Sequence, residues 1–169
     1  MDCILRSYNA REAVRHGKAL TAVDRMILMR SDPLTHSEFQ FSDRFNGLSF
    51  SSTMQDGDDG CRFKAISYSH PERWTTLIIP MDDDQEDRAM HRAQDINGKK
   101  YDLLGLGSFS SELSIIKPDP NKYWCSEACA ELIKAAYFLG ENFVPHKFTP
   151  VGLFFTLYDE IAIHGLTAA

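Results

Sequence analysis

The clearest hydrophobic pattern in the chain lies between residues 123 and 140. Apolar or small side chains recur there at intervals of three and four residues, at positions 125, 128, 129, 132, 135, 136 and 139. Pro118 and Pro120 precede this stretch and Gly140 follows it, and both features are typical of helix boundaries. The pattern therefore predicts one helix with a buried face, and Cys125 lies at the start of that face.

A second pattern has the two-residue period of a β-strand. A strand over residues 34–41 puts His36, Glu38 and Gln40 on one face. The other face then carries Thr35, Ser37, Phe39 and Phe41. One face is therefore polar and bears an imidazole.

The remaining patterns predict further elements around these two. Residues 1–9 favour a short extended segment, and residues 22–30 form an apolar stretch that fits either the end of a helix or a strand. Strand-favouring residues fill positions 48–52, 61–68 and 74–80. Helices are predicted from the acidic run at 81–87 through residue 96 and over 151–163, and the acidic residues are expected to face solvent.

These elements predict an α+β fold, in which an antiparallel sheet packs against the helix that carries Cys125. The chain has 169 residues, of which 43% are hydrophobic, and this is enough to bury one core without support from metal ions or disulfides. We therefore expect a single domain over residues 1–169, with residues 1–20 as a candidate N-terminal extension.

The charge of the chain bears on its partners. The formal net charge is −6, the sequence pI is about 5.5, and the basic residues are scattered along the chain. A nucleic-acid partner is therefore not expected. No apolar run reaches the length of a transmembrane helix, and the first residues lack the apolar core of a signal peptide. These features predict a cytoplasmic protein without a transmembrane segment.

The chain contains four cysteines, at positions 3, 61, 125 and 129. A cytoplasmic location predicts that all four are thiols and not disulfides. The cysteines and histidines do not follow the spacing of a metal-binding motif. Neither a metal ion nor another cofactor is therefore expected.

Cys125 is the candidate nucleophile. A thiol in the first turn of a helix lies near unpaired backbone N–H groups and the positive end of the helix dipole, and both favour the thiolate. The alternative is core packing, because free cysteine is among the most buried residue types and Cys129 shares the apolar face. A neighbouring base would decide between the two, and His36 with Glu38 is the candidate base with its orienting group. The alternative for that pair is a solvent-facing strand.

Three short motifs follow one another along the chain: His36-Ser37-Glu38, Gly98-Lys99-Lys100-Tyr101-Asp102 and Cys125-Ser126-Glu127. Their order resembles the permuted papain-like cysteine hydrolases, the circularly rearranged relatives of the NlpC-type cell-wall peptidases. In that family a His-x-Glu strand and a Gly-x-x-Tyr-Asp step precede a helix that starts at the nucleophile. The resemblance spans roughly residues 20–155, and Ser69-His70-Pro71-Glu72-Arg73-Trp74 is similar to small phage and prophage members.

The resemblance implies a permuted papain-like fold and a role for each of four residues. Cys125 is then the nucleophile, His36 the base and Glu38 the group that orients the imidazole. Tyr101 is then a donor on the oxyanion side. The implied reaction is cleavage of an amide, isopeptide or ester bond through an acyl-enzyme, as in a cysteine peptidase or amidase. The implied substrate is a peptide, a peptidoglycan fragment or an acyl ester.

Two other functions remain open at this point. Related permuted folds also act on lipids, so a lipid acyl hydrolase or transferase is one alternative, and an exposed apolar rim beside Cys125 would favour it. The second alternative is a structural or binding protein of a phage particle, on a papain-like fold with a vestigial site. A phage-encoded chain would then work in the cytoplasm of its bacterial host or as part of the virion.

Overall fold

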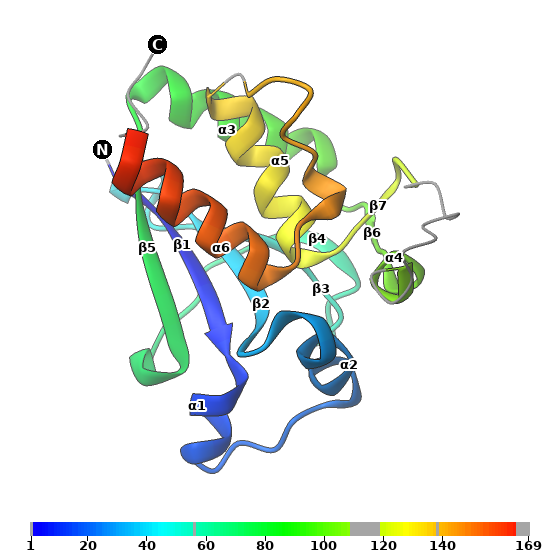
Figure 1. Ribbon diagram of the computed structural model, residues 1–169. Coiled ribbons are helices and arrows are strands. Elements are labelled where there is room, and N and C mark those ends of the chain that lie inside the picture. The colour runs from blue at the N-terminus through cyan, green and yellow to red at the C-terminus, as the bar shows by residue number, and fades with distance from the viewer. Residues whose placement is uncertain (1, 56, 109–118, 138, 165–169) are drawn as a thin grey trace.

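The computed structural model describes residues 2–55, 57–108, 119–137 and 139–164, and its centre is a five-stranded antiparallel sheet (Figure 1). The strands lie in the order β4-β3-β2-β1-β5. Their bounds are Asp2–Asn9 (β1), Leu34–Gln40 (β2), Ser49–Thr53 (β3), Gly60–Lys64 (β4) and Trp74–Pro80 (β5). The predicted antiparallel sheet is therefore confirmed.

Three helices cover one face of this sheet (Figure 1). They are α3 (Asp83–Ile96), α5 (Cys125–Tyr137) and α6 (Pro150–Asp159). α5 packs against β2, β3 and α3, while α6 packs against β1 and β2. The fold is therefore α+β, and the helix that begins at Cys125 lies on the sheet as predicted.

Shorter elements connect these two layers. The short helices are α1 (Ala10–Arg15), α2 (Ala22–Ser31) and α4 (Leu103–Ser108), and the parallel pair consists of β6 (Lys100–Tyr101) and β7 (Lys122–Tyr123). Single turns occur at η1 (Asp43–Phe45), η2 (Pro71–Arg73), η3 (Pro145–Lys147) and η4 (Glu160–His164). Within the described ranges, no helix combines the length and the apolar character needed to cross a bilayer.

Side-chain caps decide where two of the helices begin. Thr21 Oγ1 accepts a hydrogen bond from Asp24 N, and the Asp24 carboxylate accepts one from Thr21 N, which is a capping box at the start of α2. Asp82 and Gln85 form the same arrangement at the start of α3. Residues 22–30, for which the sequence pattern fitted either a helix or a strand, are therefore helical.

The hydrophobic core lies between the sheet and the three covering helices. Its fully buried side chains include Cys3, Leu5, Phe39, Phe50 and Ile79 from the sheet and Ala89, Ile96, Leu132, Ile133 and Leu153 from the helices. Burial of each large apolar side chain contributes about 1.5–3 kcal/mol. Packing of α5 on the sheet is therefore strong enough to fix the position of its first residue.

Two expectations differ from the structure. β1 lies between β2 and β5 and pairs with both, so residues 2–9 are an interior strand and not an N-terminal extension. The acidic start of α3 is not wholly solvated either, because Glu86 is fully buried. Its carboxylate accepts hydrogen bonds from Ser42 N at 2.8 Å and Ser42 Oγ at 3.0 Å.

The strands β2 and β3 meet only along part of their length, and this positions the start of α5. Their ladder lies at the Gln40 end of β2. Toward the other end, Ser52 of β3 donates its hydroxyl to Tyr123 O at 2.6 Å, just before α5 begins. The start of α5 therefore lies against the half of β2 that carries His36 and Glu38.

Candidate active site

Cys125 is the first residue of α5, and three hydrogen bonds fix the chain at this point. Trp124 N donates to Glu127 Oε2 at 3.4 Å, which is one half of a capping box. Trp124 Nε1 and Ser126 Oγ both donate to Phe148 O, at 3.1 and 2.7 Å. The thiol of Cys125 is therefore held in the first helical turn, where backbone N–H groups lack intrahelical partners.

His36 connects Cys125 to Glu38. Its Nε2 atom lies 2.8 Å from Glu38 Oε1, and its ring hydrogen-bonds with the Cys125 side chain. Because Nε2 faces Glu38, Nδ1 is the nitrogen left for the thiol. Cys125 is 1% exposed, and the side chains of His36 and Glu38 are 15% and 2% exposed. The structure thus joins three of the four predicted residues in one chain of hydrogen bonds, with Glu38 in the expected place.

This environment stabilises the protonated form of His36. Burial lowers the pKa of the imidazole, but hydrogen bonds to Cys125 and Glu38 and the negative charges of both groups outweigh that effect. The net result raises the pKa of His36 from 6.5 to about 10. His36 therefore carries a proton at neutral pH.

Arg62 on β4 completes the chain behind Glu38. Its two terminal nitrogens donate to Glu38 Oε2 and Oε1 at 2.9 and 2.7 Å, and its Nε donates to Asp58 Oδ2 at 3.1 Å. Burial raises the pKa of Glu38, whereas hydrogen bonds from His36 and Arg62 lower it, and the net pKa lies below its ordinary value. Glu38 therefore remains a carboxylate and holds the imidazole in place.

The sequence did not reveal Arg62 as part of the site. β3 lies between β2 and β4, and Ser51 of β3 is the register partner of Arg62. The small serine lets the guanidinium reach across β3 to Glu38. The alternating pattern at 61–68 was the available signal, but it does not tell which strands become neighbours.

Tyr101 reaches the site from β6. It is the register partner of Tyr123 on β7, which precedes Cys125 by two residues, and it lines a cavity of about 90 Å³ together with His36. Burial, followed by the charges of Cys125 and Asp102, raises the pKa of Tyr101 well above the ordinary value of 10.0. The phenol therefore keeps its proton and remains a hydrogen-bond donor.

The place of β6 depends on Gly60. This glycine has a φ of +119°, and a Cβ atom there would lie 2.0 Å from Lys99 O. Cys61 N donates to the same carbonyl at 2.8 Å, and Gly98 N donates to Cys61 O at 2.8 Å. Only a residue without a side chain allows β4 to approach β6 this closely, and that approach sets the position of Tyr101.

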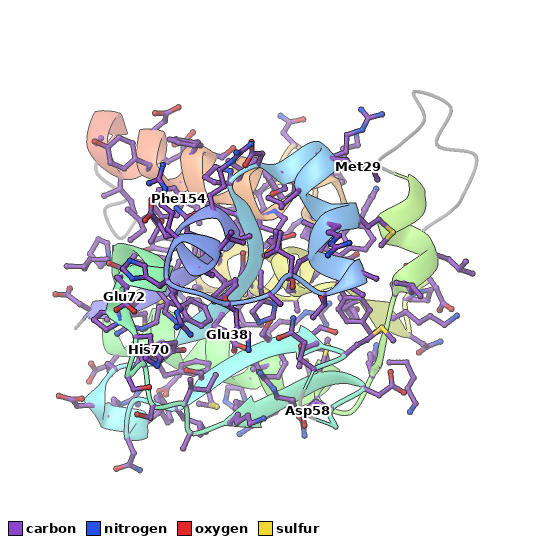
Figure 2. The ribbon with its side chains drawn as sticks, turned by 90° about the horizontal axis from the view of Figure 1, so that it is seen from below. Met29, Glu38, Asp58, His70, Glu72 and Phe154 are labelled. Carbon is purple, nitrogen blue, oxygen red and sulfur yellow. The ribbon has the colours of Figure 1, made fainter. Side chains whose placement is uncertain are left out.

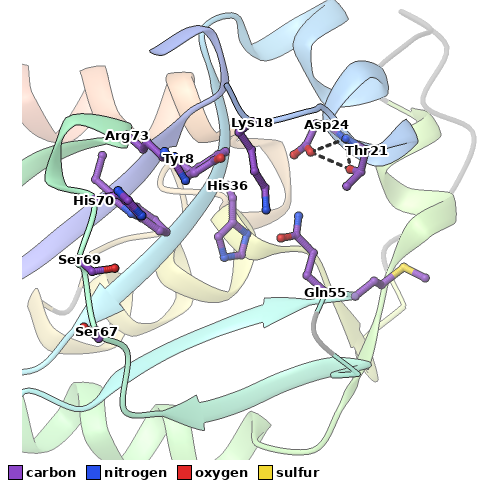
Figure 3. Close-up of a pocket in the computed structure, with 12 residues that line it drawn as sticks. Tyr8, Lys18, Thr21, Asp24, His36, Gln55, Ser67, Ser69, His70 and Arg73 are labelled. Carbon is purple, nitrogen blue, oxygen red and sulfur yellow. Dashed lines mark hydrogen bonds between the residues drawn. The ribbon is translucent and has the colours of Figure 1, made fainter. Parts of the chain in front are cut away.

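Two larger cavities meet at His36. One has a volume of about 420 Å³ and extends toward the loop before α2 and toward η2 (Figure 3). The other has a volume of about 250 Å³ and extends toward Arg62. Both are also lined by Gln55, Ser67 and Trp74. Together they form a cleft across the imidazole.

The other three cysteines are buried free thiols. Burial is the main cause that raises the pKa of Cys3, of Cys61 to about 12, and of Cys129. In the part of the chain that the structure describes, no three His, Cys, Asp or Glu side chains form a group able to hold a metal ion. Cys125 therefore differs from the other thiols by its contact with an imidazole.

Removal of the Cys125 thiol is expected to lower the pKa of His36 toward its ordinary value. Cys125→Ala removes one hydrogen bond and one nearby negative charge, while the burial that lowers the pKa remains. An NMR titration of the imidazole nitrogens in wild type and variant measures the change.

His146 is the matched control for this titration. Partial burial and the charge of Lys147 lower its pKa, and Cys125 is not among the causes. The pKa of His146 should therefore be the same in both proteins. A His36 titration that Cys125→Ala leaves unchanged would show that thiol and imidazole are not coupled.

Comparisons of the chain with protein-family models, with curated proteins and with solved structures find no match. The resemblance to permuted papain-like hydrolases consequently rests on the three motifs and their order. The geometry around Cys125 is the independent observation that bears on function.

Proposed function

We propose that this protein is a cysteine hydrolase that cleaves an amide, isopeptide or ester bond through an acyl-enzyme. The observation that carries the proposal is the chain of hydrogen bonds from Cys125 through His36 to Glu38. A thiol, an imidazole and an acid in this arrangement have the roles of a nucleophile, its base and an orienting group. The three motifs and the α+β architecture are compatible with a permuted papain-like fold and support the same assignment.

In the proposed reaction, the Cys125 thiolate attacks the carbonyl carbon of the substrate, and the carbonyl oxygen becomes an oxyanion. N–H groups at the start of α5 and the Tyr101 hydroxyl are the proposed donors to that oxyanion. Collapse of the intermediate breaks the bond to the leaving group, which takes a proton from the His36 imidazolium. Water then gives a proton to His36 and attacks the thioester, which releases the acid product and restores the thiolate.

The cleft favours a polar substrate chain. Cys125 is 1% exposed, so a substrate approaches it through the two cavities that meet at the partly exposed His36. Lys18, Asp24 and Arg73 line the larger cavity. Such a polar wall suits a peptide or a peptidoglycan fragment better than the acyl chain of a lipid.

Iodoacetamide at pH 6 is expected to alkylate Cys125 at least about ten times faster than the other three thiols. Burial raises the pKa of Cys3, Cys61 and Cys129, so these thiols stay protonated. Cys125 instead lies beside His36, whose imidazole is the proposed base for the thiol proton. A time course of labelling, read peptide by peptide by mass spectrometry, measures the selectivity.

Two histidine variants control this experiment. His36→Ala should remove most of the selectivity, whereas His146→Ala removes an imidazole from η3 and should leave it intact. Equal labelling of all four cysteines, or labelling of Cys125 only after unfolding, would contradict the proposal that Cys125 is the nucleophile of a hydrolase. That result would favour a vestigial site in a structural or binding protein, such as a component of a phage particle.

A further inference from the structure

The 420 Å³ cavity beside His36 carries two cationic side chains that the proposed reaction does not use. Lys18 comes from the segment between α1 and α2, and Arg73 comes from η2, just before β5. Figure 3 shows the Lys18 side chain extending toward His36 and Gln55, with Arg73 on another side of the same cavity. The fold thus brings two positive charges from distant parts of the chain to one cavity.

In the part of the chain that the structure describes, neither cation is hydrogen-bonded to a carboxylate, although Glu72 forms an ion pair with Arg73 at 3.8 Å. Among the described residues, the Lys18 ammonium group has no ion pair or hydrogen bond. Arg73 donates through one terminal nitrogen to His16 O at 3.3 Å. Its Nε atom is buried and finds no hydrogen-bond acceptor in the same described ranges. A buried donor without an acceptor is costly, and a ligand with an acceptor oxygen would relieve that cost.

The carboxylates near these cations are already engaged. Glu72 Oε1 lies 3.8 Å from Arg73 Nε and 3.2 Å from His70 Nδ1, and Figure 2 shows His70 and Glu72 near each other at the edge of the molecule. Asp24 accepts hydrogen bonds from Thr21 N and Oγ1 at 2.9 and 2.7 Å as the cap of α2. Neither carboxylate therefore serves as the hydrogen-bond acceptor that Arg73 Nε lacks.

The cavity has a positive charge balance within an acidic protein. Among the described residues, Lys18, Arg73 and protonated His36 face it, against the lining carboxylate of Asp24 and the Glu72 carboxylate that is ion-paired with Arg73. The whole chain has a formal net charge of −6. A concave site of the opposite sign attracts small anions while the rest of the surface repels large polyanions.

We propose that this cavity binds a carboxylate or phosphate group of the substrate, next to the bond that is cleaved. Arg73 offers a donor without an acceptor, Lys18 offers a mobile ammonium group, and the rings of Tyr8 and Trp74 form a wall. The position beside the scissile bond rests on the proposed function of Cys125, whereas binding of the anion does not. Anionic substrates then have a lower KM than neutral analogues of the same size.

Binding is tested on the wild-type protein with N-acetyl-L-glutamate, its neutral counterpart N-acetyl-L-glutamine, and inorganic phosphate. The indole N–H of Trp74, a residue that lines the cavity, reports binding in NMR spectra and is identified with Trp74→Phe. Protection of Cys125 from iodoacetamide by the same probes reports whether the bound anion lies beside the thiol.

Charge-removing variants identify the residues that bind. Lys18→Met and Arg73→Met are each expected to weaken binding of N-acetyl-L-glutamate by at least about tenfold. Lys147→Met removes one exposed cation from η3, outside the residues that line the cavity, and should leave binding unchanged. This control separates a local contact from the change in net charge.

The outcomes separate the anion site from the hydrolase. A response to N-acetyl-L-glutamate but not to N-acetyl-L-glutamine, weakened in both variants, supports a carboxylate site, and a response to phosphate alone assigns the site to a phosphate group. If the protein binds the anion but Cys125 is unreactive, the anion site is supported and the proposed hydrolase function is contradicted. Equal binding of the charged and neutral probes, no response to any probe, or unchanged binding in both variants overturns the anion site, whatever the reactivity of Cys125.

Discussion

Replacement of Cys125 by alanine is expected to lower the hydrolysis of p-nitrophenyl acetate by at least about 10³-fold, because the acyl group loses the nucleophile that carries it. His36→Ala should cause a similar loss, since the thiol and the imidazole that is hydrogen-bonded to it act as one unit. Release of p-nitrophenolate gives the rate, and an initial burst would report the acyl-enzyme directly.

Cys129→Ala is the matched control for that experiment. It makes the same chemical change one helical turn further along α5, at a fully buried thiol whose pKa burial raises well above 9.0. Hydrolysis should stay near the wild-type rate, provided that circular dichroism shows each variant to be folded. Hydrolysis that survives Cys125→Ala but disappears in Cys129→Ala would place the reactive thiol elsewhere than we propose.

Arg62→Met is expected to lower the free energy of unfolding by about 3 kcal/mol at pH 7, because it leaves a buried carboxylate without its guanidinium partner. The Glu38 side chain is 2% exposed and would lose two hydrogen bonds, at 2.7 and 2.9 Å. Such a loss is a large share of the roughly 5–15 kcal/mol that stabilises an ordinary domain. Equilibrium unfolding in urea measures it.

The effect of Arg62→Met should depend on pH. The pKa of Glu38 in the folded protein lies below the ordinary 4.5, so its pairing stabilises the fold above pH 4.5 and is lost as the pH falls through that lower value. The pKa of His36 is raised from 6.5 to about 10, so its contribution is complete below pH 6.5 and is lost as the pH rises toward 10. The free energies of unfolding of wild type and Arg62→Met should therefore differ least in acid, where Glu38 is protonated and no longer needs a cationic partner.

Lys64→Met provides the surface counterpart. Lys64 pairs with Asp58 at 3.0 Å, but its side chain is 38% exposed, so its removal should cost less than about 1 kcal/mol. If Arg62→Met lowers the free energy of unfolding by less than Lys64→Met does, the guanidinium of Arg62 does not stabilise the buried carboxylate of Glu38.

The two elements that carry the site were predictable because their patterns are local. A three- and four-residue period marks α5, and the last proline before it leaves Cys125 near its start. A two-residue period marks β2 and puts His36 and Glu38 on the same face. Local spacing was therefore enough to propose each half of the site, and the order of the motifs suggested that the halves meet.

The parts that escaped prediction all depend on which elements become neighbours. Arg62 reaches Glu38 across β3, and β1 is an interior strand because β5 pairs along its other side. Glu86 is buried because the loop that carries Ser42 donates to it. Hydrophobic periodicity states which face of an element is buried but not what lies against that face. The cleft across His36 could not be predicted for the same reason, since residues from several loops line it.

The order of the strands and α5 along the chain has a consequence for protein synthesis. β1 to β5 leave the ribosome before α5, so a growing chain carries His36 and Glu38 before it carries Cys125. The thiol meets its imidazole only when α5 docks on β2 and β3. Under the proposed function, a nascent or truncated chain therefore lacks the assembled pair of thiol and imidazole, and the proposed hydrolysis requires the completed fold.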